Sequence, residues 1–392
     1  MYEMKTEIKT AIICGLIITV GIISISIFYN EVDMKRNTTY NIEIDDKSKL
    51  QKVPSILDAT EYINISPNEL AETLEGKVVL YDIWTYSCIN CIRTLPYITT
   101  WDEKYRNEGL MIVGIHTPEF EFEKNKDNVV AAVQKFDINY PVVLDNEKEI
   151  WNAFQNQYWP RKYIVDHDGY IRYDHIGEGA YKETEKVIQQ LLQERSESLN
   201  LKTNSFELTT LNEFEHSTFR TPELYFGYKF ASGRNNLGNE NGFNPEEVVE
   251  YNIPLELKQH YFYLDGKWNN SKDSMKLTSE NGLIVLEYNA KQVNIVASNA
   301  AELEIFIDGE FVPEYMTGVD LSQDSKVMIT EPRLYNIVNS SVTESHELVI
   351  KVNNPEFEIF TFTFGKFMTK TDIYVIKFDP ITLFFFSSDI KC

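Results

Sequence analysis

The stretch WTYSCINCIR, residues 84–93, decides the fold, because Cys88 and Cys91 form a CxxC motif within it. It follows the apolar run VVLYDI at 78–83, which is short and rich in β-branched residues and predicts a buried strand. The segment 92–105 predicts a helix, so the CxxC opens a helix directly after a strand. There the two thiols lie close enough to form a disulfide, and the first lies over unpaired backbone N–H groups that favour a thiolate. The pattern predicts a dithiol–disulfide redox centre.

The rival interpretation of a CxxC is one half of a structural zinc site, which needs a second Cys or His pair at ligand spacing. The other two cysteines, Cys14 and Cys392, lie near opposite ends of the chain, and the six histidines form no HxxxH-type pair. Redox chemistry is therefore favoured over zinc binding. Neither a metal nor an organic cofactor is predicted, and four cysteines are too few for a disulfide framework.

Length and composition predict two ordinary folded domains rather than a disordered chain. The sequence has 392 residues, of which 43% are hydrophobic and 13% aromatic. Its formal net charge of −23 argues against nucleic-acid binding and against docking of the soluble part on anionic lipid.

The N-terminal region predicts a single membrane anchor. After a tail at residues 1–9, residues 10–29 (TAIICGLIITVGIISISIFY) carry no charge and are long enough to cross the roughly 30 Å hydrocarbon core. We favour a retained anchor over a cleaved signal peptide, because the apolar run is long and lacks a good small-x-small site. Basic residues flank both ends equally, so the orientation rests on the CxxC, which is best suited to an oxidising compartment. The predicted location is the cell membrane, with the soluble domains outside the cytoplasm.

Beyond the anchor the chain divides into two folded parts. Residues 30–56 are polar and predict a tether. Residues 57–195 alternate strands and helices and predict an α/β domain around a mixed sheet. Residues 196–220 predict a linker with a weak strand, whereas 221–365 show short alternating runs typical of an all-β sandwich or jelly roll. The last segment, 366–392, predicts only an extra strand or a disordered extension.

Residues 78–192 resemble the thioredoxin fold, and the likeness reaches well beyond the CxxC. It extends over WTYSCINCIRTLPY, GIHTPEFEFEK, YPVVLDNEKEIWNAFQNQYWPRKYIVD and GEGAYKETEKVIQQLL, which are similar to TlpA/ResA-type extracytoplasmic thiol-disulfide oxidoreductases. The likeness is strongest to the thioredoxin-like part of DipZ-type membrane proteins. The segments LDGKW, TEPRLYNIV and FTFTFG resemble the carbohydrate-binding-module-like domain that follows it in those proteins.

The resemblance implies roles for the two thiols and for a proline. It makes Cys88 the exposed nucleophile and Cys91 the resolving thiol. Pro160 would be the cis-proline that faces the disulfide, since Trp159 and Pro160 stand directly before the expected strand 161–165. Without the resemblance, an ordinary loop-to-strand boundary would be the better interpretation of this proline.

The resemblance also implies roles for acidic and aromatic residues. Asp82 would lie beneath the disulfide and take the proton of the resolving thiol, although a solvated aspartate at a strand end is the alternative. Glu119 resembles the active-site glutamate of the cytochrome-maturation reductases, but the alignment also allows Glu121, and either carboxylate can be a solvated loop charge. The aromatic residues expected either to wall the site or to lie in the core are Trp84, Tyr86 and Trp159.

Two departures from related families limit what can be transferred. Ile89 and Asn90 replace the Gly-Pro of thioredoxin, so a redox potential cannot be carried over. Tyr81 stands where a PxxxTxxC peroxidase motif needs proline, which disfavours a peroxidase. A copper chaperone of this fold is disfavoured as well, because it needs a CxxxC spacing and a distal histidine.

The sequence therefore predicts a membrane-anchored thiol-disulfide oxidoreductase that reduces disulfides of client proteins. A single anchor that contains only Cys14 cannot pass electrons across the bilayer by dithiol exchange, so a separate membrane donor of the CcdA type is expected. The rival function is a binding or scaffold protein in which the all-β domain acts and the CxxC is accessory. A carbohydrate contact by that domain is implied by the resemblance, but aromatic residues of such a domain are more often core than sugar platform. The aromatic residues considered for this contact are Tyr225, Tyr228, Tyr261, Trp268 and Tyr335.

Overall fold

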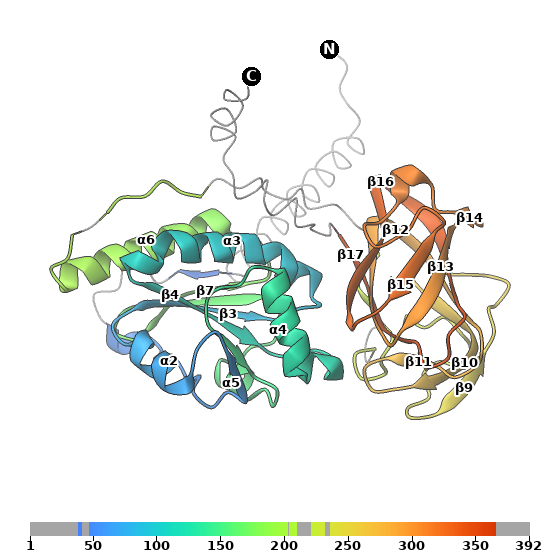
Figure 1. Ribbon diagram of the computed structural model, residues 1–392, viewed down its shortest axis with the longest axis horizontal. Helices are drawn as coiled ribbons and strands as arrows, with labels where there is room; N and C mark the ends of the chain where they lie inside the picture. Colours follow the sequence, from blue (N-terminus) through green and yellow to red (C-terminus); the bar gives the residue numbers. More distant parts are fainter. Residues whose placement is uncertain (1–37, 41–46, 203, 210–220, 232–235, 366–392) are drawn as a thin grey trace, which may run out of the picture.

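An α/β domain and an all-β domain lie side by side in the computed structural model (Figure 1). The predicted anchor at 10–29 and the C-terminal extension at 366–392 lie outside the described residues. Within the described part of the chain, no helix is both long and apolar enough to cross a membrane. The structure describes residues 38–40, 47–202, 204–209, 221–231 and 236–365.

The α/β domain is built on a seven-stranded mixed sheet with the strand order β1-β7-β6-β3-β4-β5-β2, which confirms the predicted mixed sheet. The central strand β3 runs parallel to β4 and antiparallel to β6. The strands are β1 (Thr38–Tyr40), β2 (Glu61–Ile63), β3 (Val78–Trp84), β4 (Leu110–His116), β5 (Val142–Leu144), β6 (Arg161–Val165) and β7 (Ile171–Ile176). The α-helices are α2 (Pro67–Leu74), α3 (Ile89–Tyr105), α4 (Lys126–Lys135), α5 (Glu149–Ala153) and α6 (Tyr181–Ser198), with 3-10 helices η1 (Lys47–Lys49), η2 (Arg106–Glu108) and η3 (Glu121–Lys124).

Helices cover both faces of this sheet, so every residue of β3 is buried. On one face Leu80 and Trp84 pack against α3, α4 and α6, and on the other Tyr81 and Ile83 pack against α2 and α5. Because side chains alternate along a strand, Asp82 lies on the same face as Leu80 and Trp84. That face is the one covered by the CxxC-bearing helix α3.

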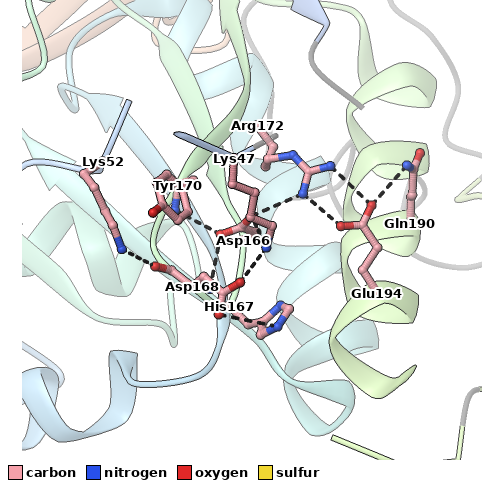
Figure 2. Close-up of polar contacts among 9 residues, drawn as sticks. All are labelled: Lys47, Lys52, Asp166, His167, Asp168, Tyr170, Arg172, Gln190 and Glu194. Carbon is pink, nitrogen blue, oxygen red and sulfur yellow. Dashed lines mark hydrogen bonds and ion pairs between the residues drawn. The ribbon is translucent and has the colours of Figure 1, made fainter. Parts of the chain in front are cut away.

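The described residues of the predicted tether belong to the α/β domain, which corrects the boundary expected at residue 56. Strand β1 pairs with β7, Lys52 pairs with Tyr170, and the side chain of Ile56 is buried. Figure 2 shows Lys47 beside Asp166 in the turn between β6 and β7. The polar composition of this segment predicts solvated residues in a flexible tether. In the structure, Lys47 is instead held by an ion pair with Asp166.

The expected linker is also partly folded. Helix α6 continues to Ser198, and the described residues 204–209 return to its flank without forming the strand predicted there. Thr209 donates hydrogen bonds to Glu185, and Phe206 packs against the core of the α/β domain. Within 196–220, residues 203 and 210–220 lie outside the described residues.

The all-β domain is confirmed, and its strands surround one apolar core. The runs predicted at 282–288 and 292–297 merge into the long strand β12, and β16 begins well before the run predicted at 346–352. Bulges near Ala290 and Val293 bend the paired chains without interrupting the ladder. Trp268 and Tyr335 are fully buried in the core. The strands are β8 (Leu224–Tyr225), β9 (Val248–Tyr251), β10 (Phe262–Asn270), β11 (Met275–Leu277), β12 (Gly282–Ser298), β13 (Ala301–Ile307), β14 (Glu310–Phe311), β15 (Lys326–Ile329), β16 (Arg333–Val352) and β17 (Glu358–Phe364), with the 3-10 helix η4 (Glu314–Met316).

Candidate redox site

The CxxC motif occupies the turn between β3 and α3, as the sequence predicts. Cys88 is the N-cap of α3, and its Sγ accepts a hydrogen bond from the backbone N–H of Cys91 at 3.4 Å. An N-cap sulfur lies over the unpaired N–H groups of the first turn, where negative charge is stabilised. Both thiols are free, and Cys88 is partly exposed whereas Cys91 is only 1% exposed. A reactant from solvent therefore reaches Cys88 first.

The two thiols differ in their electrostatic surroundings as well as in exposure. Burial raises the pKa of the Cys91 thiol well above its usual range, and its hydrogen bond with Cys88 and the charge of Asp82 raise it further. Cys91 is therefore a poor thiolate until a base removes its proton. This division fits the nucleophile and resolving roles that the resemblance implies.

Asp82 lies in β3 with a side chain that is 1% exposed, and its Oδ1 has no hydrogen-bond partner among the described residues. Burial raises its pKa to about 6, and the positive charge of Lys162 acts in the opposite direction. The carboxylate is thus largely ionised at neutral pH but ready to take up a proton. Its neighbour across the ladder is Gly114, where a Cβ would approach Trp84 Nε1 within 2.9 Å, so only glycine fits beside that indole.

Lys162 is a site residue that sequence reasoning missed. It lies in β6 directly opposite Asp82 in β3, so the two side chains share one face of the sheet. Its side chain is 0% exposed, and Nζ donates to the backbone oxygen of Gly177 at 3.1 Å. Burial lowers its pKa, and the charges of Asp82, Cys91 and Glu178 oppose that shift. A lysine near the start of a strand is normally solvated. Only the pairing of Lys162 with Asp82 across the sheet shows that this lysine belongs to the site.

The Trp159–Pro160 peptide bond is cis. Trp159 is partly buried, its Nε1 donates to the backbone oxygen of Thr117 at 3.0 Å, and its ring lies 4.2 Å from that of Trp151. These contacts join the start of β6 to the loop after β4. That Pro160 faces the thiols remains an expectation.

The other two expected wall residues are buried. Trp84 is a core residue whose ring lies edge-on to His116 at 5.3 Å, while Tyr86 stacks on the same imidazole at 5.7 Å. Burial lowers the pKa of His116 to about 3, so the ring is neutral at physiological pH. The hydroxyl of Tyr86 donates to the backbone oxygen of Pro332 in the all-β domain at 3.3 Å.

Three glutamates follow β4 in quick succession, and they differ sharply. Glu119 is partly exposed, and its Oε1 lies within hydrogen-bond distance of the Tyr225 hydroxyl oxygen, at 2.8 Å. Glu121 is exposed and pairs with Lys124 at 3.0 Å. Glu123, which sequence reasoning did not single out, is 0% exposed.

Glu123 is the carboxylate that connects this loop to the CxxC. Its Oε1 accepts a hydrogen bond at 2.6 Å from the hydroxyl of Ser87, the residue directly before Cys88. Its Oε2 accepts hydrogen bonds from the backbone N–H groups of Glu119 at 2.7 Å and Phe120 at 2.9 Å. A buried carboxylate with several donors fixes the groups around it. The loop after β4 and the nucleophile loop therefore form one frame.

The all-β domain covers one side of the CxxC turn. Ile89, the residue after Cys88, is 4% exposed and packs with Phe120 against Val296 of β12, Leu334 of β16 and Phe360 of β17. The rings of Phe120 and Phe360 lie 5.1 Å apart. Ile89 is thus a docking residue for the second domain, a role that local sequence could not indicate.

A metal centre finds no support within the described ranges, where no group of three or more His, Cys, Asp or Glu side chains could hold an ion. The described side chains offer a thiol pair beside a buried carboxyl group whose pKa is raised.

Comparison with known proteins agrees with the two-domain division. A family model described as Redoxin matches residues 51–192, and a model described as a thioredoxin-like C-terminal domain matches residues 221–365. Protein DipZ of Mycobacterium bovis is 31% identical over 314 residues, which are 80% of this chain and 42% of DipZ. The chain therefore spans less than half the length of that relative.

Smaller proteins match the α/β domain alone. Thiol-disulfide oxidoreductase YkuV of Bacillus subtilis is 28% identical over 118 residues, which are 30% of this chain and 79% of YkuV. A solved thioredoxin-like protein in the oxidised form is 25% identical, with 37% of this chain and 97% of that chain covered and a TM-score of 0.34. The chain thus matches a Redoxin model over its α/β domain and a thioredoxin-like C-terminal domain model over its all-β domain, and it is similar to known thiol-disulfide oxidoreductases.

Proposed function

We propose that this protein is a membrane-anchored thiol-disulfide oxidoreductase that reduces disulfides of client proteins outside the cytoplasm. The observation that carries the proposal is the position of three side chains around one turn. Cys88 is partly exposed at the N-terminus of α3, Cys91 is buried in the first turn of the same helix, and Asp82 is buried on the sheet face that α3 covers. The kinship with thiol-disulfide oxidoreductases supports the same chemistry.

The reaction starts with Cys88. Its thiolate attacks one sulfur of a client disulfide, forms a mixed disulfide and releases the other client sulfur as a thiolate, which takes a proton from solvent. Cys91 then gives its proton to Asp82 and attacks the sulfur of Cys88. The remaining client sulfur leaves as a thiolate and is protonated, so the client gains two electrons and the Cys88–Cys91 pair becomes a disulfide.

The raised pKa of Asp82 suits the second step. A carboxyl group with a pKa of about 6 is ionised at pH 7, yet it holds a proton much better than a solvated carboxylate. Lys162 keeps the buried ensemble neutral, because one positive charge balances one negative charge before and after the proton moves from Cys91 to Asp82. The proton transfer therefore relocates a buried charge without creating one.

Each cycle ends with an oxidised pair, so the protein needs an electron source. The predicted anchor at 10–29 contains a single cysteine, and we propose that a separate membrane protein of the CcdA type reduces the pair. Anchoring raises the effective concentration of the redox domain near such a donor. The anchor and the exterior location are parts of this proposal.

The position of the all-β domain does not favour the rival scaffold function, because the domain packs directly on the CxxC turn. Of the aromatic residues considered for sugar contact, Trp268 and Tyr335 are buried and Tyr225 binds Glu119, which leaves partly exposed Tyr228 and Tyr261. Carbohydrate binding by this domain is a lesser proposal for this reason.

Insulin reduction with dithiothreitol as electron source tests the function on the full-length chain. We expect catalysis by the natural chain, none by Cys88→Ser, and mixed disulfides with clients that accumulate on Cys91→Ser. Equal activity of the natural chain and Cys88→Ser would contradict the proposal. In cells, loss of the membrane donor should leave the Cys88–Cys91 pair oxidised. A pair that stays reduced would contradict the proposal that the protein acts as a reductase supplied by that donor.

A further inference from the structure

The all-β domain contacts the redox centre at the residue next to the nucleophile. Ile89 lies in an apolar cluster with side chains from three strands of that domain, β12, β16 and β17. Two polar contacts lie beside this cluster: Tyr86 reaches Pro332, and the backbone N–H of Glu121 donates to Asp273 Oδ2 at 2.9 Å. The domain is therefore placed to influence the CxxC turn itself.

A second contact crosses the boundary at Glu119. The hydroxyl oxygen of Tyr225 in β8 lies 2.8 Å from Glu119 Oε1 and 2.9 Å from Glu223 Oε2. From Glu119 the connection continues through the Glu119 N–H to Glu123 and from Glu123 to Ser87, which precedes Cys88. An unbroken series of hydrogen bonds thus joins the all-β domain to the nucleophile loop.

We propose that Tyr225 and Glu223 are positioning residues of the redox site, which bind a protonated Glu119 across the domain boundary and so hold the loop that carries Cys88. The inference rests on the proposed redox role of Cys88 and assigns the all-β domain a part in that site.

The number of hydrogens supports the protonated state. A tyrosine hydroxyl carries one hydrogen, yet the oxygen of Tyr225 lies within hydrogen-bond distance of two carboxyl groups. If both carboxyl groups were ionised, one contact would bring two oxygens together without a hydrogen between them. The arrangement is therefore complete only when Glu119 or Glu223 is protonated. With the proton on Glu119, Glu119 Oε1 donates to the Tyr225 oxygen and the Tyr225 hydroxyl donates to Glu223 Oε2.

The surroundings favour Glu119 as the proton carrier. Burial raises the pKa of Glu119 well above its usual range, and the negative charges of Glu223 and Glu123 raise it further. Lys148 is the charged group that opposes this shift, and Tyr225 opposes it by hydrogen bonding. Loss of the proton would place two carboxylates around one hydroxyl and weaken the domain contact.

Ionisation should consequently loosen the CxxC turn. When the contact between Tyr225 and Glu119 weakens, the all-β domain packs less firmly on Ile89. The first turn of α3 then opens more often. The backbone N–H of Ile92, which donates to the Cys88 oxygen at 3.0 Å, reports that opening directly.

Amide hydrogen exchange of the reduced full-length chain, followed over a pH series and corrected for intrinsic rates, tests this inference. In the natural chain the protection of Ile92 should fall about tenfold as pH rises through the titration of Glu119. Tyr225→Phe should already show the lower protection at low pH. Glu119→Gln should keep high protection at every pH, because its amide carries its own hydrogens.

The matched control is Tyr228→Phe, which removes a hydroxyl that binds Glu246 at 2.7 Å on the same domain. It should leave the protection of Ile92 unchanged. If Tyr225→Phe behaves like Tyr228→Phe, or if Glu119→Gln retains the pH dependence of the natural chain, the inference is wrong.

Insulin reduction by the same variants separates this inference from the proposed function. If the natural chain fails to reduce insulin while the exchange pattern is as expected, the proposed function fails and the domain contact stands. Normal insulin reduction with pH-independent protection of Ile92 would overturn the contact alone.

Discussion

Strand β6 joins two polar clusters that differ in how well their charges are satisfied. Beyond its C-terminal end, Asp166 accepts hydrogen bonds from the backbone N–H groups of Asp168 at 3.1 Å and Tyr170 at 3.0 Å, and it pairs with Lys47 and Arg172 (Figure 2). Near its N-terminal end, Lys162 lies opposite Asp82, whose Oδ1 has no hydrogen-bond partner in the described part of the chain.

The difference shows that a buried carboxylate can either stabilise the fold or take part in proton transfer, depending on how many hydrogen-bond donors surround it. A buried carboxylate with several donors is stabilised in its ionised form and fixes the chain around it. A buried carboxylate that lacks donors keeps its pKa close to neutral and can exchange a proton. The same strand therefore ends beside a well-paired carboxylate at Asp166 and begins beside the proposed proton acceptor Asp82.

The largest expected effect is on the rate of the resolving step. Asp82→Asn should slow the attack of Cys91 on the mixed disulfide by about 10²- to 10⁴-fold, because the thiol loses its proton acceptor. The first attack by Cys88 should change much less. Stopped-flow measurement of both steps with a peptide disulfide checks this, with Asp166→Asn as the control, and equal slowing of both steps would argue against a proton-acceptor role.

The second prediction concerns the satisfied cluster. Asp166→Ala should lower the free energy of unfolding by roughly 3–5 kcal/mol. It leaves two backbone N–H groups without their acceptor and removes one of the two carboxylates that pair with buried Arg172, which keeps Glu194. Urea unfolding measures the loss. The exposed neighbour Asp168→Ala should cost less than about 1 kcal/mol, and a similar cost for the two variants would show that the pairing of Asp166 does not stabilise the fold.

The third prediction is a gain in stability at the redox site. The pKa of Asp82 is about 6 in the folded chain, above that of an unfolded aspartate, so the free energy of unfolding falls as pH rises from about 4 to 6. Asp82→Asn removes this penalty and should stabilise the chain at pH 7 by up to roughly 3 kcal/mol, since each pKa unit corresponds to about 1.4 kcal/mol. The gain should vanish near pH 3.5. Urea unfolding at both pH values provides the check, and destabilisation at pH 7 would contradict it.

The smallest expected effect is a shift in pH dependence. Lys162→Met removes the charge that opposes the raised pKa of Asp82, so the pH midpoint of the resolving step should rise by about one unit or more. Lys104→Met, which removes a lysine that pairs with Glu185 at 2.8 Å, is the matched control. An unchanged midpoint in Lys162→Met would mean that the lysine acts only in packing.

Local signals predicted much of the fold and the two thiols. The strand before Cys88, the helix after it and the later α/β alternation follow from hydrophobic period and turn residues, and the likeness to known oxidoreductases pointed to the cis bond before Pro160. Helix α2 was missed although Ser66 caps it and Pro67 stands at its first position, a pattern that indicates a helix start.

Other features depend on contacts between distant residues. Lys162 and Glu123 look like ordinary surface charges until the sheet register and the loop after β4 bury them. The segment around Lys47 looks like a linker until it meets Asp166. The contact of Ile89 with three strands of the second domain joins positions that are far apart in the chain, so no local pattern predicts it.

Differential alkylation of the reduced full-length chain tests the central claim most directly. Brief exposure to iodoacetamide, followed by mass spectrometry, reports the rate at which each thiol reacts. The account predicts that Cys88 is modified well before Cys91, and that an oxidant converts the unmodified pair to a single Cys88–Cys91 disulfide. Faster modification of Cys91, or failure of the pair to form that disulfide, would contradict it.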